Sequence, residues 1–172
     1  MSNAFEEIFG DVIGNYIDPD PIFGDVCQVK VKKLNPEAEL PTRGSEEAAG
    51  WDLYANLELE NIVIEPHVTV KIGTGLAMAI EKGWEGQIRP RSGLATKKGL
   101  RPANTPGTID SDYRGEIIVA LHNDSDENQM ILNGERIAQI CFKKVPTVLW
   151  KIVDNLDNTE RGSGGFGSTG IK

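Results

Sequence analysis

The residue types best suited to chemistry are concentrated in one short segment, Gly107-Thr-Ile-Asp-Ser-Asp-Tyr-Arg-Gly-Glu116. Two carboxylates, Asp110 and Asp112, and the phenol of Tyr113 occur in an expected turn that leads directly into an alternating run. A turn held by a rigid strand commonly displays catalytic groups, and the flanking glycines give its backbone freedom. Taken alone, the segment indicates no more than a polar hairpin turn, so its interpretation depends on the other motifs.

A second group of residues is suited to holding an anion. Arg91, Ser92 and the backbone N–H of Gly93 occur together in Arg89-Pro-Arg-Ser-Gly-Leu-Ala95, which is expected to form a turn. A guanidinium, a hydroxyl and a free N–H at one turn can share an anionic oxygen. A purely structural turn is the alternative for the same residues.

Two polar side chains interrupt strand-like apolar runs. Asp52 is the single acid in Ala48-Ala-Gly-Trp-Asp-Leu-Tyr54, and such a carboxylate either pairs with a cation or holds something outside the protein. Gln139 follows the charged turn that starts at Gly134 and is expected on a half-buried strand face, where its amide needs a partner.

The chain ends in a glycine-rich segment, Arg161-Gly-Ser-Gly-Gly-Phe-Gly-Ser-Thr-Gly170, with five glycines in ten residues. Such a segment forms no stable element and is expected to be mobile when no ligand is bound. Arg161 could grip a phosphate through its planar fork. Phe166 could stack on a base, which is worth about 1–3 kcal/mol. A disordered tail is the alternative that composition alone favours.

The elements that position these groups are expected to be short strands. Residues 27–150 alternate apolar and polar side chains between Gly, Pro, Asn and Asp, which is typical of an antiparallel sandwich, jelly roll or barrel. The clearest strands are expected at Cys27–Leu34, Val68–Ile72, Leu76–Ile80, Glu116–Asn123 and Arg136–Val145. Residues 151–172 are expected to form a C-terminal arm.

Residues 1–26 form a separate acidic extension with six acids and no Lys or Arg. Within it, residues 4–17 place apolar side chains at the spacing of one helix face, with Asn3 as a candidate cap. The run Asp18-Pro-Asp-Pro21 is expected to end that helix. The helix is expected to pack on its own assembly, with a regulatory protein partner or disorder as the alternatives.

Bulk composition indicates one soluble domain of 172 residues. A net charge of −8 argues against a nucleic-acid partner, and no apolar run approaches the roughly 18 residues of a membrane span. Cys27 and Cys141 are expected to be buried thiols in a reducing cytoplasm, and two histidines without cysteine pairs argue against structural zinc. A cytoplasmic location in a bacterial or phage-infected cell is expected.

The order and spacing of the motifs resemble those of the trimeric dUTP pyrophosphatase (dUTPase) family. The matches are Asp52 in A-G-x-D-L, Arg91 in P-R-S-G, Asp110 in G-x-I-D-x-D-Y-R-G, Gln139 in G-x-R-I-A-Q and Phe166 in R-G-x-G-G-F-G-S-T-G. The resemblance covers residues of about 28–170 and leaves the acidic extension outside. It implies an all-β, jelly-roll-like barrel that forms homotrimers and hydrolyses dUTP to dUMP and pyrophosphate, with each site shared between chains.

The resemblance also implies a role for each matched residue. Asp110 would activate the attacking water, Tyr113 would pack under the deoxyribose, and Asn104 with the backbone of Gly107 and Ile109 would contact uracil. Arg91, Ser92, Gly93 and Gln139 would contact phosphates, and Arg161, Phe166, Gly167 and Ser168 would close over the substrate. Mg²⁺ would be held by the substrate phosphates without a direct protein ligand, with Asp52 reaching it through water.

Other charged residues near these motifs are expected to be structural. Lys97, Lys98, Arg101 and Arg114 are expected at the surface or rim, and Asp112 and Glu116 within turn and sheet pairing. Two rival functions remain at this point. A dCTP deaminase shares the implied fold but lacks the glycine-rich arm, and a nucleotide-gated interaction protein would use the N-terminal extension.

Overall fold

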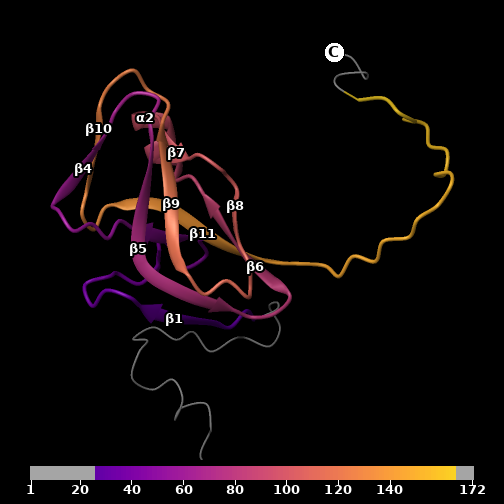
Figure 1. Ribbon diagram of the computed structural model, residues 1–172, viewed down its shortest axis with the longest axis horizontal. Helices are drawn as coiled ribbons and strands as arrows, with labels where there is room; N and C mark the ends of the chain where they lie inside the picture. The colour runs from indigo at the N-terminus through magenta and orange to yellow at the C-terminus, as the bar shows by residue number, and fades with distance from the viewer. Residues whose placement is uncertain (1–25, 166–172) are drawn as a thin grey trace, which may run out of the picture.

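A computed structural model of the protein describes residues 26–165, and these are predominantly β-structure. Figure 1 shows the elements in chain order. They are β1 (Val29–Lys33), β2 (Thr42–Arg43), β3 (Trp51–Tyr54), β4 (Asn61–Ile64), β5 (Thr69–Ile80), β6 (Trp84–Arg89), α2 (Ser92–Lys98), β7 (Leu100–Pro102), β8 (Gly107–Ile109), β9 (Glu116–Asn123), β10 (Gln129–Leu132) and β11 (Arg136–Lys144).

The described strands form three separate sheets rather than one continuous barrel. Their orders are β1-β5-β9-β7, β10-β4 and β2-β3-β11-β6-β8. One hydrophobic core joins them, because Ile72 and Val119 from the first sheet pack in the same cluster as Leu53 and Ile140 from the last. The expectation of an all-β fold is confirmed, whereas closure into a barrel is not seen in the hydrogen bonding of one chain.

Strand β9 explains how the sequence pattern produces the core. Its side chains alternate strictly, with Ile117, Val119 and Leu121 buried and Ile118 exposed, as expected for a strand that covers a core with one face. The strand has the bounds that the sequence predicts. It lies between β5 and β7, so the turn that precedes it is attached to a central strand.

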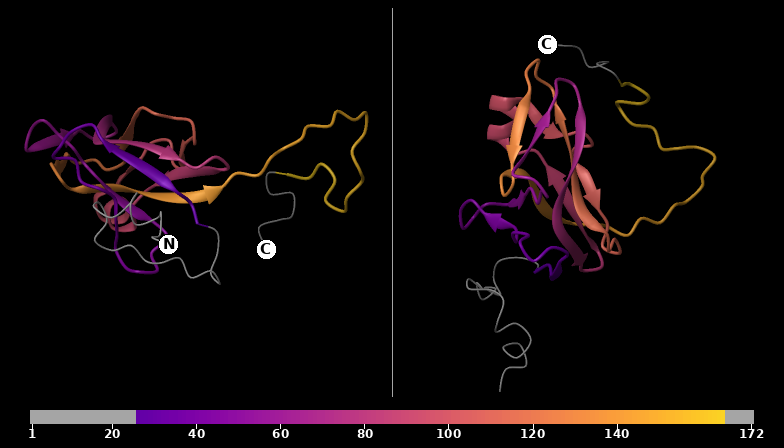
Figure 2. Two further views of the ribbon diagram at one scale, coloured as in Figure 1. Left: turned by 90° about the horizontal axis from the view of Figure 1, so that it is seen from below. Right: turned by 60° about the vertical axis from the view of Figure 1, so that its left-hand side comes forward.

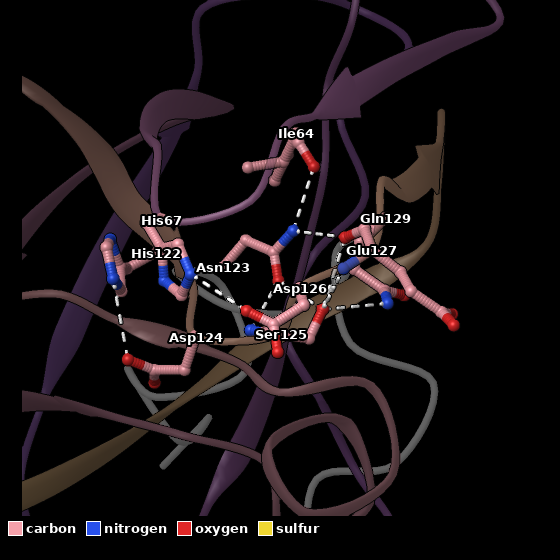
Figure 3. Close-up of polar contacts among 9 residues, drawn as sticks. All are labelled: Ile64, His67, His122, Asn123, Asp124, Ser125, Asp126, Glu127 and Gln129. Carbon is pink, nitrogen blue, oxygen red and sulfur yellow. Dashed lines mark hydrogen bonds and ion pairs between the residues drawn. The ribbon is translucent and has the colours of Figure 1, made fainter.

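Asn123 ends β9 at a core position and is fully buried. Its amide nitrogen donates to the carbonyls of Ile64 at 3.0 Å and Glu127 at 2.7 Å. Its oxygen accepts from the N–H and hydroxyl of Ser125, at 3.0 and 2.7 Å. Figure 3 shows this arrangement beside His122 and Asp124. A buried amide that makes all of these bonds fixes the end of β9 opposite the acidic segment.

Two local predictions were wrong. The sequence predicts separate strands at 68–72 and 76–80, but β5 runs continuously through both, with its register to β9 shifted between Gly73 and Ala77. This is the signature of a β-bulge. The predicted turn at residues 89–95 instead leads into the seven-residue helix α2, which ends at Gly99 with φ of 68°.

The ends of the described chain differ from the sheets. Residues 145–165 contain no helix or strand, and Figures 1 and 2 show them leaving the end of β11 and running away from the sheets. The predicted N-terminal helix lies outside the described residues. Of the two thiols, Cys141 is buried as predicted, but Cys27 is only partly buried. In residues 26–165, no helix has the length and apolar character needed to cross a membrane.

Candidate active site

The acidic turn, residues 107–116, begins at β8 and ends at β9. Asp110 directly follows β8 and is exposed. Within residues 26–165, no hydrogen bond or ion pair engages its carboxylate. An open pocket of about 230 Å³ lies beside it, lined by Thr108, Ile109, Asp110, Tyr113, Glu116 and Ile118. The carboxylate is therefore available to a water or ligand in that pocket.

Tyr113 is fixed within the same turn. Its N–H donates to the Asp110 carbonyl at 3.1 Å, and its phenol donates to the Glu116 carbonyl at 3.0 Å. The ring packs on Gly115, where an added Cβ would lie 2.3 Å from the phenol oxygen. Glycine is required there because any side chain would displace the ring. The sequence analysis missed this role of Gly115, although its place after Tyr-Arg marked a turn.

Asn104 and Gly107 lie against each other at the start of β8, the end opposite Asp110. A Cβ at Gly107 would be 3.1 Å from the Asn104 amide nitrogen, so the small residue lets the side chain approach the backbone. The Thr105–Pro106 peptide bond between them is cis. The structure thus brings together the residues predicted to contact a base, and Ile109 contributes to the adjoining pocket.

Asp52, Arg91 and Arg136 form an arginine cluster on the second large sheet. The carboxylate of Asp52, only 9% exposed, accepts from Arg91 Nε at 2.8 Å and from Arg136 Nη1 at 3.1 Å. Arg91 also donates to the Arg136 carbonyl at 3.2 Å. Asp52 therefore pairs with cations, one of the two alternatives that its place in an apolar strand allowed. Arg136 was missed, and its position in Gly134-Glu-Arg was the available signal.

Gln139 lies next to this cluster. Its amide donates to the Pro90 carbonyl at 2.9 Å, which supplies the partner that its half-buried position requires. Gly50 leaves room for it, because a Cβ there would lie 2.0 Å from the Gln139 amide oxygen. Ser92 and Gly93 are exposed on the first turn of α2. Of the predicted phosphate-contacting residues outside the arm, Gln139 on β11 bonds to the residue before Arg91, and Ser92 and Gly93 follow Arg91 at the start of α2.

Strand β6 separates the two groups. On one side Ile109 stands opposite Gly86, and on the other Gln139 stands opposite Arg89. Arg91 is five residues beyond Gly86 in the sequence, a span of about 16 Å at a strand rise of about 3.3 Å per residue. One chain therefore presents the acidic turn and the arginine cluster toward opposite ends of the same strand.

The arm residue Arg161 is exposed, and its Nε donates to the Gly164 carbonyl at 2.9 Å. This bond makes a small loop within the glycine-rich segment itself. Phe166, Gly167 and Ser168 lie outside the described residues, so their predicted roles rest on the sequence.

The remaining charged residues near the motifs have structural partners. Arg101 pairs with Asp124 through two bonds of 2.6 and 3.0 Å. Lys98 pairs with Glu135 at 3.0 Å. Arg114 donates to two carbonyls of its own turn. Arg101 and Arg114 thus have partners that suit a structural role, whereas Lys98, expected at the solvated surface, is partly buried in an ion pair.

The chemistry of the site suits Mg²⁺ bound to a triphosphate. Among residues 26–165, no three His, Cys, Asp or Glu side chains are grouped so that they could hold a metal ion. Mg²⁺ commonly retains several waters and takes ligands from substrate phosphates. The Asp52 carboxylate has the oxygen chemistry to accept from such a water, although both of its oxygens already bond to arginines. Asp52 therefore fits a role in which it reaches Mg²⁺ through a water molecule.

Comparison with known proteins assigns this geometry to a family. The sequence matches the family model described as dUTPase over residues 36–170. A deoxyuridine 5'-triphosphate nucleotidohydrolase of Nautilia profundicola is 54% identical over 143 residues, which cover 83% of this chain and 99% of the relative. The protein of the same name from Rickettsia massiliae is 50% identical over 147 residues, covering 85% and 99%.

The fold matches as well. A solved variant of the Staphylococcus bacteriophage 80alpha dUTPase, in complex with dUpNHpp, superposes with a TM-score of 0.73 at 28% identity, covering 84% of this chain and 99% of that one. A β-rich fold of nucleotide-hydrolysing enzymes is thus the class on which structure and comparison agree. The chain belongs to the dUTPase family.

Proposed function

We propose that this protein hydrolyses dUTP to dUMP and pyrophosphate. The observation that carries the proposal is the unpaired Asp110 carboxylate beside a pocket that Tyr113 lines. Asp110 orients a water and takes its proton as that water attacks the α-phosphorus in line, an effect typically worth about 10²–10⁴-fold in rate. Family membership and the names of the relatives support the reaction.

Substrate choice follows from the groups around the same turn. Asn104 and the backbone of Gly107 and Ile109 contact the uracil edge, and cytosine leaves these polar groups unpaired, so its rejection is strong. Tyr113 packs under the deoxyribose where a 2′-hydroxyl would otherwise fit. Its ring is suited to this because its packing on Gly115 and its bond to the Glu116 carbonyl fix it from two sides.

The triphosphate is held by cations and backbone groups. Arg91, Ser92, Gly93 and Gln139 contact its oxygens, and Arg161 takes the γ-phosphate while Phe166, Gly167 and Ser168 close over the base. Mg²⁺ supplies neutralisation of charge on the phosphates when it is bound. Asp52 holds the guanidinium of Arg91 in place, so the cluster is oriented before the substrate arrives. These local charges offset the net charge of −8.

Each site is assembled from several chains of a homotrimer. The separation of the acidic turn and the arginine cluster supports this, because in one chain the two groups lie toward opposite ends of β6. The pocket of about 230 Å³ is also smaller than the roughly 300–1,000 Å³ of most ligand sites. The described part of the C-terminal arm leaves its own sheets and so is free to complete a neighbouring site. Closure of the jelly-roll-like barrel is likewise proposed to occur in the trimer.

The reaction limits uracil incorporation into DNA and supplies dUMP for dTMP synthesis in the cytoplasm. A dCTP deaminase would require the acidic turn to read cytosine, and both relatives described above carry the dUTP hydrolase name instead. A regulatory protein partner for residues 4–17 stays a prediction from the sequence alone.

Hydrolysis in ¹⁸O-labelled water tests the proposed attack. Attack at the α-phosphorus places the label in dUMP, with none in pyrophosphate, because the new P–O bond forms at that atom. Label in pyrophosphate would show attack at the β-phosphorus. That result would contradict the proposed position of the attacking water beside Asp110, although the products would still be dUMP and pyrophosphate.

A further inference from the structure

Glu116 is the residue at which the acidic turn meets the bulged strand β5. The register of β9 against β5 shifts between Gly73 and Ala77, and Ala77 pairs with Glu116. The bulged backbone in between includes Gly75, whose φ is 67°. A bulge leaves backbone groups without ladder partners, so other groups must satisfy them.

Side chains from both strands make the missing bonds. The Gly75 N–H donates to Glu116 Oε1 at 2.7 Å, and the buried Thr74 hydroxyl donates to the Ile117 carbonyl at 2.8 Å. Gly73 leaves room for the carboxylate, because a Cβ there would lie 2.4 Å from Glu116 Oε1. The Glu116 carboxylate is therefore fitted to the bulge by distance and by shape.

The backbone of the same residue holds the turn. The Glu116 carbonyl accepts the Tyr113 phenol at 3.0 Å. Glu116 also lines both the pocket beside Asp110 and a second pocket that includes Asn56, Glu58 and Gly75. One residue therefore contacts the bulge through its carboxylate and the Tyr113 ring through its carbonyl.

The bulge is itself anchored to the strand that carries Asp52. The Asn56 N–H donates to the Gly73 carbonyl at 2.9 Å, and the Leu34 N–H donates to the Gly75 carbonyl at 2.7 Å. Asn56 follows β3 by two residues. The Glu116 carboxylate therefore fastens the start of β9 to a backbone that is held from two further directions.

We propose that Glu116 is a positioning residue that sets the depth of the Tyr113 ring and thereby the enzyme's discrimination between deoxyribose and ribose. The inference rests on the proposed function, in which Tyr113 packs under the sugar. Without the carboxylate, the Gly75 N–H loses its acceptor and the Glu116 carbonyl is released from its fixed position. The ring then yields to a 2′-hydroxyl that it otherwise excludes.

Four variants separate reach from charge. Glu116→Gln keeps an oxygen that accepts from Gly75 but loses the charge, whereas Glu116→Asp keeps the charge but loses the reach. Glu116→Ala loses both. Gly73→Ala pushes the carboxylate off its partner without changing Glu116. Glu58→Ala is the matched control, because Glu58 is an acid that lines the second pocket only.

The measurement is kcat and KM for dUTP and for UTP, with the trimer checked by sedimentation. We expect Glu116→Ala and Glu116→Asp to lower the dUTP-to-UTP ratio of kcat/KM by about 3- to 10-fold, the scale of one net hydrogen bond. The loss appears in KM for dUTP more than in kcat. Glu116→Gln retains most of the wild-type dUTP-to-UTP ratio of kcat/KM, and the control Glu58→Ala leaves that ratio unchanged.

Gly73→Ala provides an independent arm if the alanine variant at Glu116 does not fold. It lowers the ratio to a similar extent, and combining it with Glu116→Ala adds little, because both act on one contact. A ratio that stays unchanged in Glu116→Asp and Gly73→Ala overturns the inference, as does a Gln variant as poor as the Ala variant. A wild-type protein without dUTP turnover instead overturns the proposed function.

Discussion

The acidic turn and the C-terminal segment, residues 145–165, which includes the described part of the predicted arm, hold their predicted substrate contacts in different ways. In the turn, Tyr113 is bonded at both its N–H and its phenol. In the C-terminal segment, Leu149 and Trp150 just before the predicted arm and Ile152 within it are 89%, 92% and 99% exposed. Contiguous exposed apolar residues mark a surface that another molecule covers. This difference agrees with the proposal that the acidic turn is built within one chain, whereas the C-terminal segment acts on a neighbour.

The same contrast separates the two arginines assigned to phosphates. Arg91 is held by a buried carboxylate, whereas the side-chain bond of Arg161 within residues 26–165 goes to the carbonyl of Gly164 in its own loop. A guanidinium that is already oriented loses little conformational entropy when the ligand binds. One that the ligand must order loses more, so closure of the segment becomes coupled to binding. Substitutions in the turn should alter chemistry and selectivity, and changes in the arm should alter closure.

Replacing Asp110, the proposed general base, is expected to impair the acidic turn most severely. Asp110→Asn should lower kcat by about 10²–10⁴-fold, the scale of a positioned general base, because the amide cannot take a proton from water. Binding of a non-hydrolysable dUTP analogue, measured by calorimetry, should be retained. Asp112→Asn, in the same turn, is the control and should change kcat little. An unchanged rate in Asp110→Asn would remove this residue from the mechanism.

Removing the arm after Arg161 tests the half that depends on closure. The loss of Phe166 stacking predicts a fall of about 10- to 100-fold in kcat/KM, given about 1–3 kcal/mol per stacked base. The shortened protein should still sediment as a folded trimer, because the described core lies outside the deleted residues. A shorter truncation that removes only Ile171 and Lys172 serves as control. Full activity after the longer deletion would make the segment a linker.

A methyl group at Gly115 should disturb the acidic turn without changing any charged residue or the C-terminal segment. In Gly115→Ala the new Cβ would lie 2.3 Å from the Tyr113 phenol, so the ring must move. Overpacking of this kind costs roughly 1–3 kcal/mol of folding stability, so the variant should melt at a lower temperature, and the displaced ring should lower kcat/KM for dUTP. Gly44→Ala, where a Cβ meets nothing within 4 Å, should behave as wild type. Equal kinetics for both variants would contradict the fixed ring.

Loss of Arg136 should have a smaller effect on the arginine cluster. In Arg136→Gln, Asp52 keeps Arg91 but loses a partner at 3.1 Å, so the Arg91 guanidinium is oriented less strictly. We expect KM for dUTP to rise about 2- to 10-fold, the scale of one net hydrogen bond, with little change in kcat. Arg114→Gln, on the acidic turn, is the comparison. A kcat effect larger than the KM effect would place Arg136 in the chemistry itself.

The smallest effect is expected on folding stability, at Asp124, which lies outside both the acidic turn and the C-terminal segment. The hydrogen bond from Arg101 lowers the pKa of Asp124 below its ordinary value of 3.8, with added attraction from Arg101, His122 and His67. A depressed carboxyl pKa stabilises the fold above the unfolded pKa and loses that contribution as the pH falls through the folded value. Asp124→Asn should therefore melt slightly below wild type at neutral pH. The difference should shrink below pH 3.8, and a growing difference would contradict the sign.

Local pattern was enough to predict much of the β-structure. The alternation of Ile117, Val119 and Leu121 predicted β9 with its exact bounds, because one buried face leaves a period of two in the sequence. It failed at β5, where the run Gly73-Thr-Gly75 has the composition of a turn. There the bonds that keep the strand continuous come from Glu116 and Ile117 on β9, more than forty residues away.

The candidate site shows the same limit. Asp110 and Tyr113 were predictable because carboxylate, phenol and glycines are neighbours in sequence. The Asp52–Arg136 pair joins residues 84 positions apart, and the role of Gly115 depends on where a ring folds back. The division of Asp110 and Arg91 along β6 required the strand register, which no local pattern contains.

The most direct test of the central claim is turnover of dUTP, dCTP, dTTP and UTP with Mg²⁺, followed by proton release and product identification. The account predicts rapid formation of dUMP and pyrophosphate from dUTP alone, because the acidic turn excludes both cytosine and the 2′-hydroxyl. Comparable turnover of UTP or dCTP would contradict a prebuilt turn that selects base and sugar.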